Sequence, residues 1–243
     1  TTLFRSGVDV TFADGTVSAF DLVVGADGLR STVRGLVMGP IAPTFRAQAC
    51  LRAVIPRPPE VTQETQFQGR GQRHVGLTPT GPNTMYLYCC VPVGDTSAPQ
   101  SQALPEILRD YLAGFGGPIA AARESIHDPD QVNYTALETI LVGEPWYRGH
   151  TVLVGDAAHC TTPQLAAGAA MCLEDALVLG DELARAATIA EGLQAYSKRR
   201  FDRCRYVVES STQLTAWQVQ DETPDEQQRQ LVAEAIGVLA GTY

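Results

Sequence analysis

Hydrophobic and polar positions alternate in some parts of the chain and run continuously in others, which predicts strands of two kinds. Residues 7–20 alternate around Ala13-Asp14-Gly15, which predicts a half-buried β-hairpin. The continuous run Leu22-Val23-Val24 predicts a strand buried on both faces. From about residue 43 to 98, β-rich stretches separated by Pro and Gly predict an antiparallel sheet. The chain is thus expected to begin within one sheet and to continue into another.

The second half of the chain is predicted to be mainly helical. Residues 103–123 carry hydrophobic positions at helical spacing with an interruption at Gly116-Gly117-Pro118, which predicts a helix, a break and a second short helix. Residues 151–155 (TVLVG) predict another buried strand, followed by a loop. Three further helices are expected, over about 164–187, 189–216 and 225–240. The order strand, loop and helix is typical of an α/β fold.

Composition and charge place the chain among globular proteins and away from nucleic-acid binders. Of 243 residues, 44% are hydrophobic and 19% are charged, and the formal net charge is −9. Basic residues are scattered, whereas a phosphate-backbone binder needs a concentrated positive face. The one basic cluster is interpreted as a solvated helix face; it comprises Lys198, Arg199, Arg200, Arg203 and Arg205.

The cysteine and histidine positions do not indicate a zinc site, and no segment resembles a signal peptide. The six cysteines contain no CxxC pair, and the four histidines form no ligand pattern with them. The longest apolar stretch, about 164–180, is interrupted by Glu174-Asp175 and is too short to span a bilayer. We therefore expect no metal, no membrane contact, and a cytoplasmic location with reduced thiols.

The first motif with chemical content is GADGLRSTVR at residues 25–34, directly after the Leu22-Val23-Val24 strand. Asp27-Gly28 places a carboxylate and a flexible backbone at the carboxyl end of that strand, where ligands of open α/β sheets bind. Ser31 is suited to cap the following helix. The alternative interpretation is an ordinary Asp-Gly turn with a capped helix.

The second motif covers residues 152–183 (VLVGDAAHCTTPQLAAGAAMCLEDALVLGDEL). Gly155 permits a sharp turn after the strand, and Asp156 offers an acceptor to a ligand hydroxyl. Pro163 fixes the loop, and the small residues 166–170 open a helix whose amides a flat ring can approach. The alternative interpretation is a small-residue helix that merely packs closely on the sheet.

Together these segments resemble the C-terminal fingerprints of the group A FAD-dependent monooxygenases, the para-hydroxybenzoate hydroxylase-like family. Residues 24–34 resemble its DG motif. Residues 155–175 resemble its GD motif, which is GDAAH followed by a Pro, a small-residue helix start and Glu-Asp. The TTP before the helix is most similar to the salicylate, 6-hydroxynicotinate and urate hydroxylase branch.

The resemblance implies an α/β (α+β) fold in which a Rossmann-like FAD-binding domain carries an inserted, mostly antiparallel substrate sheet. The expected segments are 1–40 and 149–190 for FAD binding, 41–148 for the substrate sheet and 191–243 for C-terminal helices. The family's GxGxxG segment belongs upstream of the hairpin and does not occur in this sequence. We therefore expect a C-terminal portion whose FAD-binding domain is incomplete at its N-terminus.

The resemblance also implies a reaction. In this family NAD(P)H reduces FAD, O₂ adds to give a flavin C4a-hydroperoxide, and the terminal oxygen passes to an activated aromatic ring. The expected activity is therefore hydroxylation of an aromatic or heteroaromatic small molecule, provided that the GxGxxG segment is present. Further partners considered are a homodimer copy and a separate N-terminal fragment.

Eight positions are expected at the flavin by the same resemblance: Asp27, Gly28, Gly155, Asp156, Pro163, Ala167, Gly168 and Ala169. Asp156 would hydrogen-bond the ribityl chain, while Pro163 and the backbone of 167–169 would face the isoalloxazine ring. The helix N-terminus would stabilise negative charge on the reduced flavin. Ala166-Ala167 departs from the family's usual Gly-Gln or Ala-Gln, which would remove a side-chain contact and leave the backbone contacts.

Substrate residues are expected on the central sheet. In related hydroxylases a basic residue five positions before a Pro, and an aromatic residue seven positions after it, contribute to the substrate cavity. Here these are His74, Pro79 and Tyr86, so His74 and Tyr86 are the catalytic candidates and Thr78 and Tyr88 weaker substrate-binding candidates. A histidine can deprotonate or hydrogen-bond a ring hydroxyl near neutral pH. The alternatives are a structural His74 and a Tyr88 that shares Tyr86's face and belongs to the core.

Two other functions stay open at this point. One is a flavoprotein of the same fold with another chemistry, such as an epoxidase or a peroxide-producing oxidase. The other is a non-catalytic fragment or binding module, because the ADP-binding segment is missing.

Overall fold

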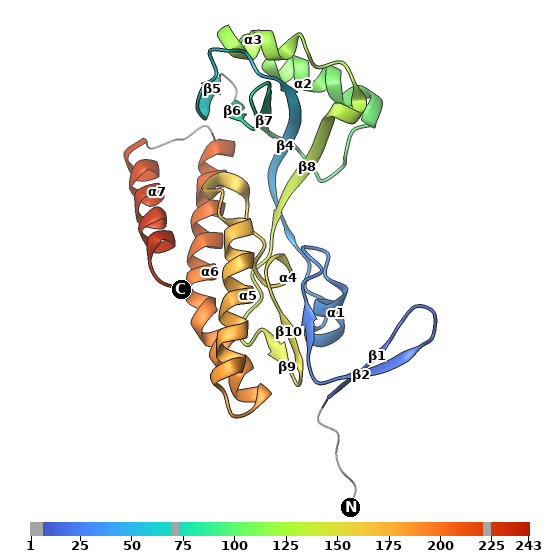
Figure 1. Cartoon of the computed structure of the whole chain (residues 1–243). Helices are drawn as coiled ribbons and strands as arrows, with labels where there is room; N and C mark the ends of the chain where they lie inside the picture. Colours follow the sequence, from blue (N-terminus) through green and yellow to red (C-terminus); the bar gives the residue numbers. More distant parts are fainter. Residues whose placement is uncertain (1–6, 70–72, 221–224) are drawn as a thin grey trace, which may run out of the picture. The chain divides into compact units, whose positions relative to one another are not determined.

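The computed structural model describes residues 7–69, 73–220 and 225–243. These residues form two compact units, which are described separately (Figure 1). Unit 1 comprises residues 7–44, 138–214 and 225–243. Unit 2 comprises residues 45–69, 73–137 and 215–220.

A three-stranded sheet forms the centre of unit 1. Its order is β3 (Val23–Gly25), β10 (Thr151–Leu153) and β9 (Tyr147–Arg148). β3 and β10 run parallel, whereas β9 is antiparallel to β10. The buried strand expected at 151–155 is thereby confirmed, since all three residues of β10 are buried.

The opening hairpin is confirmed, but its predicted burial is wrong. β1 (Val8–Thr11) and β2 (Val17–Phe20) pair antiparallel, and Gly15 closes the turn at φ 83°. Every residue of β2 is exposed, because this pair forms a sheet of its own with no layer packed on it among the described residues. Val24 was expected to lie in a strand buried on both faces, but it is 43% exposed, and β3 is an edge strand within the described part of the chain.

Helices surround this sheet in unit 1. α1 (Thr32–Met38) follows β3, and α4 (Asp156–His159) follows β10. A 3₁₀ turn (Pro163–Leu165) then leads to α5 (Gly168–Arg185). The long helix α6 (Ile189–Gln220) and the final helix α7 (Asp225–Ala240) match the two C-terminal helices that the sequence predicts. The helix predicted from 164 begins at Gly168, because Ala166 adopts the left-handed conformation at φ 50°.

The core of unit 1 is built where α5 and α6 meet β10. Val152 and Leu153 of β10 pack with Met171 and Val178 of α5 and with other buried side chains. Trp146 is fully buried and contacts Tyr196 and Phe201 of α6 at ring-centroid distances of 6.2 and 5.9 Å. Burial of such large side chains supplies the main stabilisation of the unit.

Unit 2 is organised around a five-stranded sheet in the order β5-β6-β7-β4-β8. These strands are β4 (Thr44–Pro56), β5 (Thr65–Gly69), β6 (Arg73–Pro79), β7 (Thr84–Pro92) and β8 (Val132–Thr139). The antiparallel sheet predicted for about 43–98 is confirmed. The sequence analysis did not predict β8, which joins the sheet next to β4 from a much later part of the chain.

One face of this sheet is covered by two helices, α2 (Leu104–Leu112) and α3 (Gly117–Arg123), as the helix-break-helix pattern predicts (Figure 1). Short 3₁₀ turns precede α2 and β8, at Ser101–Ala103 and Pro129–Gln131. Leu51, Leu77 and Leu87 of the sheet pack against Leu108 and other side chains of the helices. Because strand residues alternate between faces, the opposite face carries the intervening residues, many of them polar.

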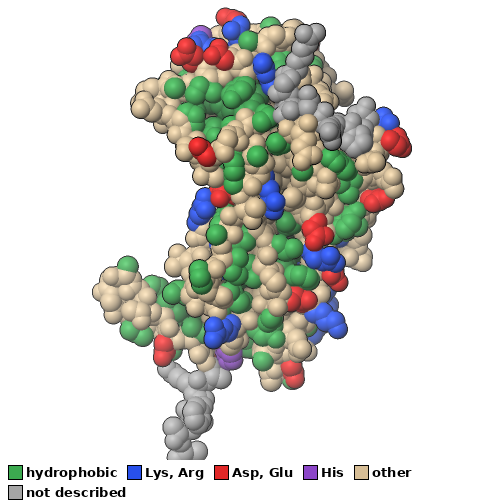
Figure 2. Space-filling model, turned by 180° about the vertical axis from the view of Figure 1, so that it is seen from behind, with side chains coloured by type: hydrophobic (Ala, Val, Ile, Leu, Met, Phe, Trp, Pro, Cys, Tyr) green, Lys and Arg blue, Asp and Glu red, His purple; other side chains and the backbone are tan. Residues whose placement is uncertain are grey.

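The surface is mixed in character. Figure 2 shows acidic and basic side chains scattered among neutral and hydrophobic ones on the face in view. Within the described residues, no helix combines the length and the apolar composition that crossing a bilayer requires.

Candidate functional site

Strand pairing in unit 1 brings the two sequence motifs to the same edge of one sheet. β3 and β10 are parallel, with Val24 opposite Val152 and Gly25 opposite Leu153. The backbone N–H of Val154 donates to the carbonyl of Gly25 at 3.1 Å, which continues the pairing to the strand ends. Carboxyl ends of parallel strands are where open α/β sheets bind ligands. The DG segment after β3 and the GD segment after β10 therefore begin side by side.

The DG segment is a capped turn. Gly28 adopts φ 77°, and the carboxylate of Asp27 accepts hydrogen bonds from the Ser31 hydroxyl and from the Val33 N–H at 3.0 Å. The Ser31 hydroxyl in turn accepts from the Arg34 N–H at 2.8 Å, so the expected capping role of Ser31 is confirmed. Partial burial acts to raise the pKa of Asp27, but these hydrogen bonds outweigh it and lower the pKa. Its predicted contact with the flavin remains a prediction.

Arg34 ties the two motifs together, a role that the sequence analysis missed. Its guanidinium is buried and donates to the carbonyl of Leu29 at 2.8 Å and to the carbonyl of Ala157 at 2.9 Å. Leu29 belongs to the DG segment and Ala157 to the GD segment. One side chain therefore sets the spacing between the two loops. The sequence signal for this role was Arg34 itself, the charged residue at the end of GADGLRSTVR.

The GD segment turns at a position that requires glycine. Gly155 has φ 59° and ψ −141°, and a Cβ atom placed there would lie 2.7 Å from the Cys172 Sγ. The N–H groups of Ala158 and His159 donate to the Gly155 carbonyl at 2.8 and 2.9 Å, which forms α4 where a loop was expected. Asp156 begins this short helix and is partly exposed.

The Asp156 side chain has a hydrogen-bonding contact within the loop itself. Its carboxylate adjoins the Cys160 thiol, whose pKa rises to about 12 through burial first and this carboxylate second. The predicted acceptor for a ligand hydroxyl is therefore partly exposed and also contacts the Cys160 thiol. Its role at the ribityl chain remains a prediction.

A buried network beneath the loop centres on Asp175 of α5. This carboxylate is fully buried and accepts from the Gly155 N–H at 2.7 Å, from His159 Nε2 at 2.6 Å and from Arg200 Nε at 2.7 Å. Burial opposes ionisation, but the hydrogen bonds from these partners outweigh it, so the pKa of Asp175 lies below its usual value. The Trp146 ring covers His159 at a centroid distance of 5.0 Å. The network holds Gly155 and hence the start of α4 in place.

The interpretation of the basic cluster as a solvated helix face is wrong for two of its five members. Arg200 is 0% exposed and pairs with Asp175 and, at 2.7 Å, with Glu174. Arg203 also pairs with Glu174 at 2.7 Å and donates to backbone carbonyls of Val238 and Leu239 at the end of α7. The physical reason is that the Glu174-Asp175 pair of α5 faces this side of α6, and buried carboxylates require charged partners. Lys198, Arg199 and Arg205 remain at the surface.

The N-terminus of α5 presents uncapped amides. Ala167 is the N-cap residue and provides no side-chain hydrogen bond, and Met171 is the first residue whose N–H reaches back to the Ala167 carbonyl. The N–H groups of residues 168–170 therefore lack intrahelical acceptors. Pro163 and Ala169 are exposed, whereas the Ala167 side chain is buried. At this helix start Gly168 and Ala169 are thus accessible, whereas Ala167 is 4% exposed, and the flavin assignment of 167–169 remains a prediction.

All four substrate candidates of unit 2 lie on one face of the sheet. Thr78 is the cross-strand partner of Tyr86, and Tyr88 follows two residues later on β7. His74 lies on the same face of β6, four residues before Thr78. The rings of Tyr86 and Tyr88 are 6.0 Å apart and tilted by 40°. This is the face opposite the helix-covered core, and their catalytic and substrate roles remain predictions.

Tyr88 shares the face of Tyr86, as expected, but it is half-buried rather than a residue of the main core. Its cross-strand neighbour is Gly76, where a Cβ atom would lie 2.1 Å from the tyrosine ring. The ring therefore lies over Gly76, where no side chain occupies the space. It also packs on a small cluster of Cys50, Cys90 and Leu137. Burial, with a smaller contribution from Glu64, raises the pKa of Tyr88 to about 12.

Arg52 on β4 completes this face and was also missed by the sequence analysis. It is the cross-strand partner of Tyr88, and its guanidinium lies within electrostatic and hydrogen-bonding reach of the Tyr86 hydroxyl. The sequence signal was an arginine in the otherwise apolar strand ACLRAVI, at the same strand parity as Cys50 and Val54.

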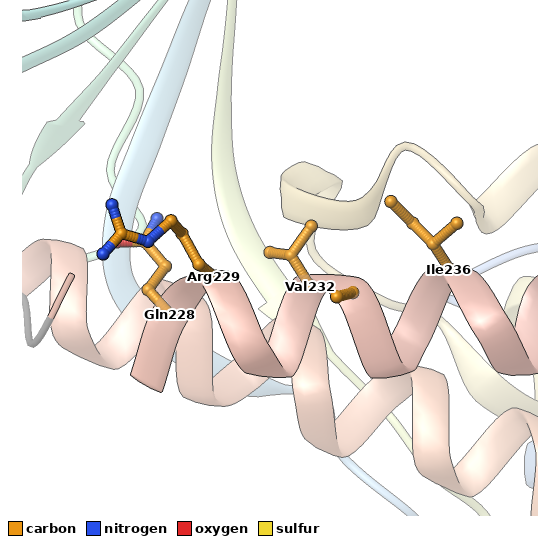
Figure 3. Close-up of a pocket in the computed structure, with 5 residues that line it drawn as sticks. Gln228, Arg229, Val232 and Ile236 are labelled. Atoms are coloured by element: carbon orange, nitrogen blue, oxygen red, sulfur yellow. The ribbon is translucent and has the colours of Figure 1, made fainter. Parts of the chain in front are cut away.

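Two other features of the described residues are not candidate sites. His159, Asp175 and Cys204 place potential metal-ligand atoms within 4.8 Å of one another, but the Arg200 guanidinium already neutralises Asp175. A hollow of about 420 Å³ lies on α7, lined by Gln228, Arg229, Val232, Ala233 and Ile236 (Figure 3). It contains none of the residues that the motifs predict.

The family follows from this combination of fold and motifs. A model of the FAD binding domain family matches residues 8–211, so the chain belongs to that family. The class expected from the DG and GD motifs, the group A FAD-dependent monooxygenases, is confirmed, as is the expected fold class.

Individual relatives carry more specific names. The chain is 36% identical over 205 residues to the 2-heptyl-3-hydroxy-4(1H)-quinolone synthase of Pseudomonas aeruginosa (strain UCBPP-PA14), with 83% of this chain and 53% of that protein covered. It is 32% identical over 211 residues to an FAD-dependent urate hydroxylase of Klebsiella pneumoniae subsp. pneumoniae, with the same coverages of 83% and 53%.

A solved structure agrees in fold. The crystal structure of Klebsiella pneumoniae HpxO complexed with FAD and uric acid matches with a TM-score of 0.82 and 27% identity, covering 98% of this chain and 60% of that one. The chain thus spans about half the length of the two curated relatives, at 53% of each.

Proposed function

We propose that the chain forms the flavin-ring and substrate portion of an FAD-dependent monooxygenase that hydroxylates an aromatic or heteroaromatic small molecule with NAD(P)H and O₂. The observation that carries this proposal is the meeting of the DG and GD segments at the carboxyl edge of β3 and β10, joined by Arg34. A ligand that touches both loops is then held by one rigid unit. A cytoplasmic location is part of the proposal, supported by six free thiols.

The chain offers two features that fit FAD. The Asp156 carboxylate is partly exposed, and its contact within the loop is with the weakly donating Cys160 thiol, so its remaining lone pairs are suited to a ribityl hydroxyl. The uncapped amides of Gly168 and Ala169 are donors at the start of an 18-residue helix, and the helix dipole favours negative charge in front of them. When bound, FAD supplies a two-electron carrier that accepts electrons from NAD(P)H and reacts with O₂.

The residues around these contacts act by positioning. Gly155 and its buried acceptor Asp175 fix the direction in which Asp156 leaves the strand. Pro163 sets the loop before α5, and its exposed ring offers an apolar surface to a flat ligand. Gly168 has no side chain, so a ring system can approach the amides closely.

Substrate recognition is proposed for the polar face of unit 2. His74 and Tyr86 are the catalytic candidates, because an imidazole can accept the proton of a ring hydroxyl and a phenol can orient it. Removal of that proton makes the ring more nucleophilic toward the oxygen donor. The names of the relatives, a urate hydroxylase and a quinolone synthase, support a heteroaromatic ring as the substrate class.

A combined measurement tests the proposal. The purified protein is examined for flavin absorbance, and hydroxylated product and H₂O₂ are quantified per NAD(P)H consumed. A monooxygenase yields flavin absorbance and product that accounts for most of the NAD(P)H. Flavin with peroxide alone would indicate an oxidase, and a colourless protein that takes up no FAD would contradict the assignment of the family's cofactor to this chain.

The His74→Ala variant tests the catalytic assignment. FAD content and melting temperature should stay unchanged, while hydroxylation should fall by about 10²–10⁴-fold, the usual contribution of a general base. NAD(P)H oxidation should then produce peroxide instead. The His127→Ala variant is the matched control, since His127 lies after α3 in an exposed position. A His74→Ala enzyme that hydroxylates as efficiently as the parent would return His74 to a structural role.

A further inference from the structure

Two cysteines face each other across the β4–β7 strand pair. Cys50 of β4 is the direct cross-strand partner of Cys90 of β7. Directly opposite residues of antiparallel strands have Cα atoms about 4.5 or 5.5 Å apart, and a disulfide accepts Cα separations of about 4.4–6.8 Å. The strand register therefore places the two thiols where a disulfide can form.

The side chains of this pair also meet. Cys50 and Cys90 are 1% and 5% exposed, and with Leu137 they form a small cluster apart from the main core of unit 2. The two sulfur atoms lie within hydrogen-bonding reach of each other. Cys89 belongs to the main core instead, because successive strand residues point to opposite faces of the sheet. Of the adjacent Cys89 and Cys90, it is Cys90 that can react with Cys50.

Cys50 differs from the other five cysteines in its electrostatic surroundings. The Cys90 thiol donates a hydrogen bond to Cys50 and, with the Arg52 charge acting in the same direction, outweighs burial and lowers the pKa of Cys50. The pKa of Cys90 is raised by the same hydrogen bond and by burial, and burial raises the pKa of the remaining four, Cys89, Cys160, Cys172 and Cys204. Because the thiolate is the reacting form, Cys50 is the thiol best suited to attack an oxidant.

We propose that Cys50 and Cys90 form a reversible dithiol–disulfide pair that hydrogen peroxide oxidises. The Cys50 sulfur attacks the peroxide, so that an S–O bond forms, the O–O bond breaks and one water leaves, which gives a sulfenic acid. The Cys90 sulfur then attacks the Cys50 sulfur, so that the S–S bond forms, the S–O bond breaks and a second water leaves. The two thiols lose two electrons and the peroxide gains them, while both thiol protons end in the waters.

This bond changes the face that carries the substrate candidates. The Cβ atoms of opposite strand residues are about 4.5–5.5 Å apart, whereas those of a disulfide are about 3.5–4.5 Å apart. Closure therefore draws β4 and β7 together beside Tyr88, which packs on the pair, and beside His74, the cross-strand partner of Cys90 on β6. Peroxide is what the proposed monooxygenase releases when hydroxylation fails, so the pair can respond to unproductive turnover. That source of peroxide rests on the proposed function, but the oxidation itself does not.

Peroxide added directly to the purified protein tests the pair without any need for flavin turnover. The reduced protein has six free thiols, of which four should remain after treatment, alkylation and unfolding. Trypsin places Cys50 and Cys90 in separate peptides, residues 47–52 and 74–109. The two peptides should appear as one cross-linked species whose mass is lower than their sum by two hydrogen atoms, with fragment ions that locate the link at Cys90. Dithiothreitol should then restore all six thiols.

Variants assign the cross-link to this pair. Cys50→Ala and Cys90→Ala should each abolish it, because each removes one of the two sulfur atoms. Cys89→Ala is the matched control and should retain the cross-link, since that side chain lies on the opposite face of the sheet. Cys172→Ala, at a half-buried position of unit 1, is a second control that leaves the core of unit 2 untouched.

Three outcomes would overturn the inference. They are six thiols that persist in excess peroxide, a cross-link that joins other cysteines, such as Cys160 and Cys172, and an oxidation of Cys50 that dithiothreitol does not reverse. Uptake of FAD by the same sample is recorded separately. It reports on the proposed function, whereas the thiol count and the peptide map report on Cys50 and Cys90 in either case.

Discussion

The loop edge of unit 1 and the open sheet face of unit 2 are built in opposite ways. At the loop edge, Gly155 and Asp27 are held by short-range hydrogen bonds, with a fully buried carboxylate beneath them. On the sheet face, Arg52, Tyr86 and His74 project from regular strands, and their positions follow from strand register alone. The first region fixes backbone direction, whereas the second displays side chains on a flat support.

This difference has consequences for substitution. In unit 1 a substitution of Asp175 affects several elements at once, because this residue joins α4, α5 and α6 through three hydrogen bonds. In unit 2 a change at Arg52 or His74 leaves the ladder intact, because β6, β7 and β4 pair through their backbones. Substitutions in the buried network beneath the loop edge should therefore lower stability, whereas substitutions of accessible residues in either region should change ligand binding.

The largest effect is expected from Asp175→Asn. The substitution leaves Arg200 without its buried counter-charge, and removal of one partner of a buried pair costs about 3–5 kcal/mol. At roughly 2–4 °C per kcal/mol for a chain of this size, the melting temperature should fall by roughly 6–20 °C. Asp181→Asn on the same helix is the control, because Asp181 is half-exposed and its loss should change stability by less than about 0.5 kcal/mol. Similar melting temperatures for the two variants would remove the distinction between the regions.

The stability difference between the parent and Asp175→Asn should also depend on pH. The pKa of Asp175 is lower in the folded chain than in the unfolded one, so its ionisation stabilises the fold above the unfolded pKa of about 3.9. That contribution is lost as the pH falls through the folded pKa. The stability gap between the parent and Asp175→Asn should therefore be constant at neutral pH and shrink below about pH 4. A gap that is unchanged in acid would mean that Asp175 does not act as a carboxylate.

Sequence patterns predicted the loop edge well and the sheet face less completely, for a physical reason. The turn at Gly155 and the loop at Pro163 depend on local backbone geometry, which neighbouring residues specify. The role of Asp156 remains a prediction. Arg200 is buried because it pairs with carboxylates 25 and 26 residues away in sequence. Its neighbours in the sequence are charged, and they alone suggested a solvated helix face. Arg52 became a candidate only when register placed it opposite Tyr88. Contacts between residues far apart in the sequence, such as these, cannot be derived from the local pattern of hydrophobic and polar residues.

A smaller effect, confined to the cofactor, is expected from Asp156→Ala. Loss of a charged acceptor for a ribityl hydroxyl should weaken FAD binding by about 10- to 150-fold, the equivalent of about 1.5–3 kcal/mol. Stability should change little, since this side chain lies outside the Asp175 network. Equilibrium dialysis measures the affinity, with Asp202→Ala, an 84% exposed position on α6, as the control. Full flavin occupancy in Asp156→Ala would contradict the assignment.

The smallest effect is expected from Gly168→Val, which separates ring approach from helix packing. A Cβ atom at Gly168 would lie 3.5 Å from the Thr161 Cγ2, an ordinary contact, so the fold accepts a side chain there. The branched methyl groups should nevertheless obstruct a ring at the helix start and weaken FAD binding by about fivefold, the equivalent of about 1 kcal/mol of overpacking. The melting temperature should stay close to that of the parent, because helix propensity changes by less than about 1 kcal/mol. Gly180→Val is the matched control, since nothing lies within 4 Å of a Cβ atom at that position of the same helix. A Gly168→Val variant that loses stability and flavin affinity together, while Gly180→Val loses neither, would assign Gly168 to packing of α5 and not to the approach of the ring.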